Sequence, residues 1–203
     1  MSFRSTVTAA CLLAVFWIGS PAQASDFQND FEVEIDRYLG LWYEIARTPN
    51  DFQDNTPKRD GERLGACKNT TAAYTLLEPG RIGVRNTCQR DGEDGGTYEE
   101  VANGIARLQD GTQGRKLKVA FGPWIARFFQ RLFTGGGSGY WIYCLGPVNA
   151  DEVYDWAVIS GSDRDYIFVV ARDRDVAPES LESILTCARN ERLPVDQLIY
   201  RQE

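Results

Sequence analysis

The sequence predicts an all-β fold, an eight-stranded antiparallel up-and-down β-barrel with one C-terminal α-helix packed outside. Three observations predict it. Eight short segments rich in β-branched and aromatic residues follow one another along the chain, turn-forming Gly, Pro, Asn and Asp residues separate them, and a single helical pattern comes after the last. Closing such a meander into a barrel pairs its two edge strands, whereas the pattern alone leaves a β-sandwich open.

The first element in the chain has the features of an export signal. Arg4 supplies a positive charge, residues 7–18 are apolar apart from Thr8, and Ala22-Gln23-Ala24 is the small-x-small pattern of a signal peptidase site. We therefore expect residues 1–24 to be a signal peptide and residues 25–203 to form a single domain.

This signal also carries an expectation about location. Cys11 follows small residues but stands near the start of the apolar run and not after it, where a lipid-modified cysteine would stand. The sequence therefore predicts a periplasmic or secreted protein after cleavage, and not an outer-membrane lipoprotein.

Eight candidate strands and their turns come next. The turns are marked by Pro79-Gly80, Asp110-Gly111 and Ser162-Asp163. The predicted strands span residues 40–47, 72–77, 82–88, 98–108, 116–122, 140–145, 156–160 and 166–172.

A helix is predicted after the strands. Pro178 suits a first-turn position, and Glu179 and Glu182 lie near the positive end of the helix dipole. Residues 196–200 are a candidate for one more short strand. The apolar stripe that would face the barrel comprises Leu181, Ile184, Leu185 and Ala188.

Composition excludes several function classes. Removal of Arg4 with the signal changes the formal net charge from −7 to −8, which leaves no electrostatic footprint for nucleic acid. The chain has no histidine, so a Ser-His-Asp or Cys-His centre and a His-ligated metal site are ruled out. We expect no catalytic residues, no metal and no cofactor. The four remaining cysteines, an even number in an exported chain, favour two disulfides.

Residues 38–47, Tyr-Leu-Gly-Leu-Trp-Tyr-Glu-Ile-Ala-Arg, resemble the first signature of the lipocalins, Gly-x-Trp, in the form seen in the bacterial lipocalin and apolipoprotein D-like branch. Residues 162–166 resemble the second conserved region and Arg172 the third, and the match extends from about residue 38 to residue 200. The resemblance implies that Gly40, Trp42 and Arg172 close the base of the barrel, with the guanidinium lying across the indole.

The resemblance also indicates which residues face the lumen, because side chains point alternately inward and outward along a strand. The mixed apolar and polar wall that results suits a ligand with an apolar chain and one polar end. A barrel that fills itself with side chains is the alternative. The expected ligand-binding residues are Glu44, Ala46, Val84, Asn86, Tyr140, Ile142, Tyr166 and Phe168.

The family topology places Cys67 and Cys88 near the same rim and implies a disulfide between them, which leaves Cys144 to pair with Cys187. Alternation along the strand gives Cys144 an inward direction, however, whereas Cys187 lies on an outer helix. A Cys67–Cys187 pairing, nearer to the apolipoprotein D arrangement, therefore stays open.

The sequence departs from the family between the fifth and sixth barrel strands. Residues 123–133 place Trp124, Phe128 and Phe129 at helical spacing, and residues 135–139 are glycine-rich. At the barrel mouth such a segment would be a lid, a transient membrane contact or a packing interface.

The favoured function is binding, storage or transport of a small hydrophobic ligand, and the resemblance implies a fatty acid or a lysophospholipid. One alternative is an enzyme on the same fold, acting on a lipid or pigment through a lumen carboxylate such as Glu44 or a free cysteine. Another is a structural partner of envelope proteins that binds no small molecule.

Overall fold

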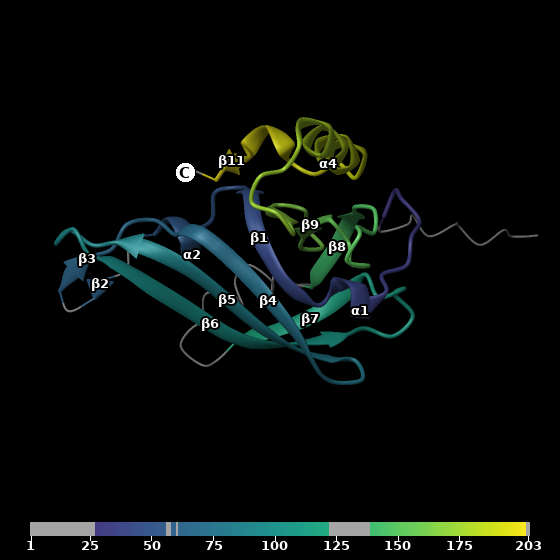
Figure 1. The fold of residues 1–203 in the computed structure, drawn as a ribbon, viewed down its shortest axis with the longest axis horizontal. Helices are drawn as coiled ribbons and strands as arrows, with labels where there is room; N and C mark the ends of the chain where they lie inside the picture. Colours follow the sequence, from purple (N-terminus) through teal and green to yellow (C-terminus); the bar gives the residue numbers. More distant parts are fainter. Residues whose placement is uncertain (1–26, 56–57, 60, 122–138, 202–203) are drawn as a thin grey trace, which may run out of the picture.

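The structure is a computed structural model, and it describes residues 27–201 apart from residues 56–57, 60 and 122–138. An antiparallel barrel of eight strands closes on itself, and one further strand extends the sheet at β1 (Figure 1). The barrel strands are β1 (Gly40–Arg47), β4 (Lys68–Glu78), β5 (Arg81–Asp91), β6 (Thr97–Leu108), β7 (Lys116–Phe121), β8 (Tyr140–Leu145), β9 (Trp156–Ser160) and β10 (Ile167–Ala171).

Neighbouring strands in the sequence are neighbours in the sheet, and β10 pairs with β1 to close the ring. The predicted up-and-down barrel is therefore confirmed. The predicted bounds of β1, β8 and β9 agree with the structure. The region predicted for a last strand forms the 3-10 helix η1 (Val195–Gln197) and β11 (Ile199–Tyr200), which pairs with β1.

Four short elements were not predicted. They are α1 (Ile35–Tyr38), α2 (Asp51–Asp54) and a hairpin of β2 (Lys58–Arg59) with β3 (Glu62–Arg63). None of them is long enough to produce a periodic apolar pattern. The helices α1 and α2 lie near opposite ends of the barrel in Figure 1.

Two hydrophobic cores share the strands. An inner core fills part of the barrel around Trp42, Ile142 and Ile159. An outer core lies between the barrel and α4 (Pro178–Asn190), which runs along β8 and β9 in Figure 1 and buries Ile184 and Ala188. The C-terminal helix is therefore outside the barrel, as predicted.

The closed end of the barrel is built around Trp42, which is completely buried. The guanidinium of Arg172 lies 3.8 Å from the centre of the indole ring, as the resemblance implies. Arg172 also donates hydrogen bonds to the backbone carbonyls of Arg37, Leu39, Leu41 and Tyr154. One side chain therefore joins α1, the start of β1 and the loop before β9.

Gly40 is required where Arg172 approaches the backbone. Its φ of +96° is a conformation that L residues with a side chain rarely adopt, and a Cβ there would lie 3.3 Å from Nη1 of Arg172. Gly40, Trp42 and Arg172 are thus held together at the base of the barrel by hydrogen bonds to the backbone as well as by ring stacking.

Both expected disulfides, Cys67–Cys88 and Cys144–Cys187, are present, with Cα atoms 5.4 Å and 6.1 Å apart. A simple hairpin register would pair Cys88 with Thr71. Two register shifts along β4 instead pair Thr71 with Thr87 and Lys68 with Gln89, which brings Cys67 beside Cys88.

The second disulfide depends on another irregularity. A register shift in β8 between Ile142 and Cys144 breaks the inside–outside alternation, so Cys144 belongs to the outer core and faces Cys187 on α4. The inward direction expected for Cys144 is therefore wrong, because alternation holds only along an unbroken strand.

Two expectations fall outside the described residues. These are the signal peptide over residues 1–24, with Cys11, and the mouth segment 123–133, with Trp124, Phe128 and Phe129. Among the described residues, no helix is long and apolar enough to cross a membrane.

Candidate functional site

The barrel holds a cavity of about 330 Å³, within the range of small-molecule sites. It extends from Tyr74 and Tyr140 to α2 and the Cys67–Cys88 disulfide, and its wall is mainly apolar. The apolar lining residues are Phe52, Ala72, Val84, Ala102, Val119, Phe121, Ile159, Phe168 and Val170. The alternative of a barrel filled by its own side chains does not hold.

Five of the eight residues expected in the lumen line this cavity: Glu44, Val84, Asn86, Tyr140 and Phe168. Three expected residues do not.

The inward direction expected for Ala46 is wrong because of a β-bulge. The register of β1 against β10 shifts between Glu44 and Ala46, so Glu44 stays inside and Ala46 joins the outer core. Ile142 faces inward but is fully buried in the inner core and does not reach the cavity surface. Tyr166 precedes the first residue of β10 and is also absent from the cavity wall.

Two tyrosines, Tyr74 and Tyr140, form the floor of the cavity, and Tyr38 lies behind them. The hydroxyl of Tyr74 donates to that of Tyr140 at 2.9 Å, and the hydroxyls of Tyr140 and Tyr38 share a hydrogen bond of 2.6 Å. Burial raises the pKa of Tyr74 to about 12 and the pKa values of Tyr38 and Tyr140 well above 10. All three hydroxyls are therefore protonated at neutral pH.

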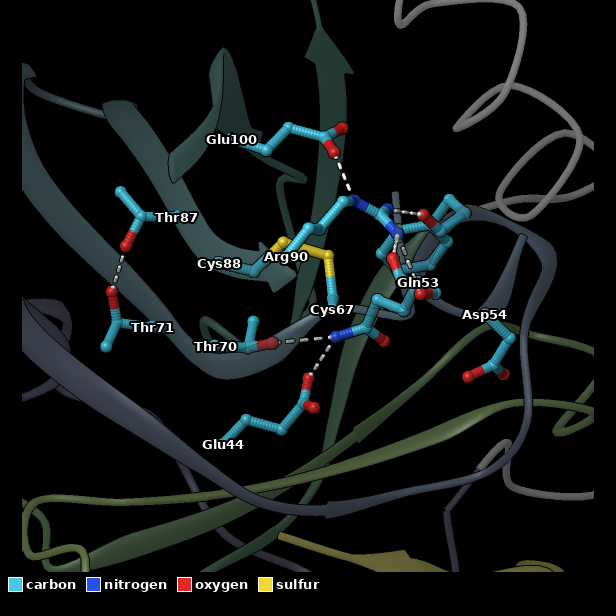
Figure 2. Close-up of a disulfide and its surroundings, with 12 residues drawn as sticks. Glu44, Gln53, Asp54, Cys67, Thr70, Thr71, Thr87, Cys88, Arg90 and Glu100 are labelled. Carbon is cyan, nitrogen blue, oxygen red and sulfur yellow. Dashed lines mark hydrogen bonds and ion pairs between the residues drawn. A yellow bond between two sulfur atoms is a disulfide. The ribbon is translucent and has the colours of Figure 1, made fainter. Parts of the chain in front are cut away.

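Near the other end, Glu44 is held by a network that Figure 2 shows in part. Its carboxylate accepts a hydrogen bond of 2.8 Å from Nε2 of Gln53 on α2, which also donates to Thr70. Nε of Arg47 lies 3.4 Å from the carboxylate, while the rest of that guanidinium binds Asp54. Burial dominates over these partners and raises the pKa of Glu44 to about 7.

Arg90 ties the rim of the cavity together. Its guanidinium is almost completely buried and donates to the backbone carbonyls of Phe52, Gln53, Asn55 and Gly65. Its Nε also donates to Glu100 on β6, beside the Cys67–Cys88 disulfide in Figure 2. This one cation therefore fixes α2 and the segment after it to β5.

Sequence reasoning missed Gln53 and Arg90, and no pattern in the chain could have found them, because both act through loop carbonyls and a four-residue helix. Tyr74, Ala102 and Phe121 could have been found. They lie on β4, β6 and β7, and extending the inward direction of Val84 across the sheet reaches all three.

The raised pKa of Glu44 predicts a pH-dependent stability. The pKa of Glu44 is about 7 in the folded protein, whereas its ordinary value is 4.5. Between these two pH values the folded state therefore binds more protons than the unfolded state. The contribution of Glu44 to the free energy of unfolding therefore falls as pH rises from about 4.5 to about 7. We expect Glu44→Gln to stabilise the protein by roughly 2–3 kcal/mol at about pH 8 and to have little effect at about pH 4.5.

Urea denaturation of the wild type and the variant at both pH values measures this effect. Glu78→Gln, at an exposed carboxylate on β4, is the matched control and should show no such difference. An equal change in stability for Glu44→Gln at the two pH values would contradict the expectation.

Comparisons of this sequence with a family model and with known proteins all point to the same family. A family model described as a lipocalin-like domain matches residues 33–203. A lipocalin of Acanthamoeba polyphaga mimivirus is 30% identical over 174 residues, covering 86% of this chain and 87% of its own. Apolipoprotein D of Oryctolagus cuniculus is 31% identical over 163 residues, covering 78% of this chain and 71% of its own.

Among solved structures, lobster apocrustacyanin A1 superimposes with a TM-score of 0.51 at 13% sequence identity, covering 84% of this chain and 79% of its own. At this identity the similarity concerns the fold alone.

One comparison corrects an expectation. The outer membrane lipoprotein Blc of Citrobacter freundii is 29% identical over 197 residues, covering 97% of this chain and 93% of its own. Proteins of the same name from Escherichia coli and Vibrio cholerae also match. The prediction of a periplasmic or secreted protein that is not an outer-membrane lipoprotein is therefore contradicted. The position of Cys11 in the apolar run was too weak a basis for it.

Proposed function

The chain belongs to the lipocalin family, and from this membership and the lined cavity we propose that it binds, stores or transports a small hydrophobic ligand inside the barrel. The resemblance implies a fatty acid or a lysophospholipid-like molecule. The observation that carries the proposal is the cavity of about 330 Å³, which has an apolar wall and polar groups at both ends.

The energetics of the wall support a ligand with an alkyl chain. Burying each methylene contributes about 0.8 kcal/mol, so an acyl chain offers roughly 10 kcal/mol before losses. Ordering of the ligand and removal of water from its polar end reduce this sum, and an affinity in the micromolar range follows.

Binding is favoured over catalysis by the state of the chemically active groups. Cys67, Cys88, Cys144 and Cys187 are joined in disulfides, so none of these four is a free nucleophile. Glu44, the buried carboxylate of the lumen, is engaged by Gln53 and Arg47.

Titration with N-phenylnaphthylamine, an uncharged fluorescent apolar probe, tests the proposal. We expect saturable binding with one site per barrel and a Kd on the order of 1–10 µM. A lipid that the protein retains from its host should compete with the probe, and native mass spectrometry followed by lipid extraction would identify it. A signal that grows linearly with the probe and never saturates would contradict the proposal.

A further inference from the structure

The wall of the cavity contains a buried polar atom that the described residues leave without a partner. Three buried side-chain atoms in the described part of the chain have no hydrogen-bond partner: Nε of Arg81, Nε1 of Trp141 and Oδ1 of Asn86. Of these residues only Asn86 lines the cavity. A buried acceptor without a partner is unfavourable, so a ligand that supplies a donor at this position gains affinity.

The strand register explains why the amide oxygen of Asn86 has no partner among its neighbours. Asn86 on β5 is paired with Ala72 on β4 and with Ala102 on β6. All three line the cavity, so the side chains on either side of Asn86 are single methyl groups. Such groups cannot hydrogen bond to the amide. Oδ1 itself has less than 1 Å² of accessible surface, and its small neighbours leave the side chain room to turn this oxygen toward a ligand.

Several other polar groups of the wall are already engaged. Tyr74 and Tyr140 bond to each other at the floor, and Thr71 bonds to Thr87 at 2.7 Å. Towards the rim, Gln53 is shared between Glu44 and Thr70. Asn86 lies between these groups, one inward position along β5 from Val84, which is the neighbour of Tyr74.

The charged residues of the cavity wall determine whether the polar end of a ligand can be charged. Three carboxylates, Glu44, Asp51 and Glu100, and one guanidinium, that of Arg90, line the cavity within the described residues. The guanidinium already binds Glu100 and four backbone carbonyls. Above about pH 7, where Glu44 is ionised, an anionic head group would therefore meet excess negative charge and, in this part of the chain, no cation free to pair with it.

We propose that the lumen selects single-chain lipids whose polar end is uncharged and donates a hydrogen bond, such as a fatty alcohol or a monoacylglycerol, and that Asn86 recognises that end. When the Asn86 side chain turns toward the ligand, the hydroxyl of such a lipid donates to Oδ1, and the amide can donate to the same hydroxyl in return. The inference deepens the proposed function and rests on it. Of the ligands that the resemblance implies, it disfavours the fatty acid anion.

Competition against N-phenylnaphthylamine with three matched lipids tests the proposal. Dodecanol carries the donor, dodecyl methyl ether lacks it, and dodecanoate replaces it with a charge. At about pH 8.5 we expect dodecanol to bind at least tenfold more tightly than dodecanoate. Asn86→Leu should weaken dodecanol roughly three- to tenfold and change the affinity for the ether by less than about twofold.

Asn103→Leu is the matched control, because Asn103 is the exposed neighbour of Ala102 on β6 and faces away from the lumen. Asn86→Ala is the second variant and removes the amide without adding volume. It should reduce the preference for dodecanol over the ether as Asn86→Leu does.

The outcomes separate this inference from the function on which it rests. Binding of all three lipids without preference, or an unchanged ratio of dodecanol to ether in both Asn86 variants, would overturn the inference alone. Failure of the wild type to bind the fluorescent probe and all three lipids would overturn the proposed function as well.

Discussion

Phe168→Asp is expected to weaken binding of an uncharged apolar probe by a hundredfold or more. Phe168 lines the cavity from β10, and its ring lies 6.1 Å from that of Phe52 on α2, so the pair forms part of the apolar wall. A carboxylate at this position would add a further acidic group to a wall that already contains Glu44, Asp51 and Glu100. The same change removes aromatic surface that the ligand would cover.

Fluorescence titration measures this affinity, and thermal unfolding establishes that the variant is folded. Phe168→Leu is the matched control, because it keeps the wall apolar and should bind within a few-fold of the wild type. Unchanged binding by a folded Phe168→Asp variant would mean that the ligand occupies some other site.

Arg172→Ala is expected to lower the free energy of unfolding by about 3–5 kcal/mol and to leave ligand affinity unchanged. The variant loses the stacking on Trp42 and removes one donor from each of four backbone carbonyls in α1, in the start of β1 and in the loop before β9. Neither Arg172 nor Trp42 lines the cavity, so the effect should appear in stability alone.

Urea denaturation and probe titration on the same samples separate the two effects. Arg174→Ala is the control, because Arg174 also stacks on an aromatic ring, that of Tyr43, but is exposed. Arg172→Lys should restore only part of the stability, since an ammonium cannot reproduce the fork geometry of the guanidinium. A loss of affinity with unchanged stability would contradict the closing role of Arg172.

The fold was predictable because strand composition and turn residues are local signals. The bounds of β1 and β8 follow directly from them. The failures occur where an extra residue enters a strand. The bulge after Glu44 turns Ala46 outward, and the shift after Ile142 does the same for Cys144. Both depend on what the strand packs against, which an alternating pattern does not encode.

The candidate site could be predicted from the sequence only where its residues lie on regular strands. Residues on regular strand segments, such as Val84, Asn86 and Phe168, were identified by alternation. The rim was not, because Arg90 and Gln53 act on backbone carbonyls and on side chains brought near by the disulfide and by α2. Interactions of this kind appear only once the chain is folded.

The pairing of β1 with β10 also sets the order in which the chain can fold. Tyr43 and Ala171, which are partners in this ladder, stand near opposite ends of the domain. The β4–β5 and β5–β6 hairpins and the β1–β4 pair can form from contacts close in the chain, whereas the edge of β1 that pairs with β10 must wait for nearly the whole domain to be synthesised. During that interval the edge of β1 that will pair with β10 is open to other chains. Barrel closure is therefore the slow, long-range step of folding, and the stage at which aggregation competes with it.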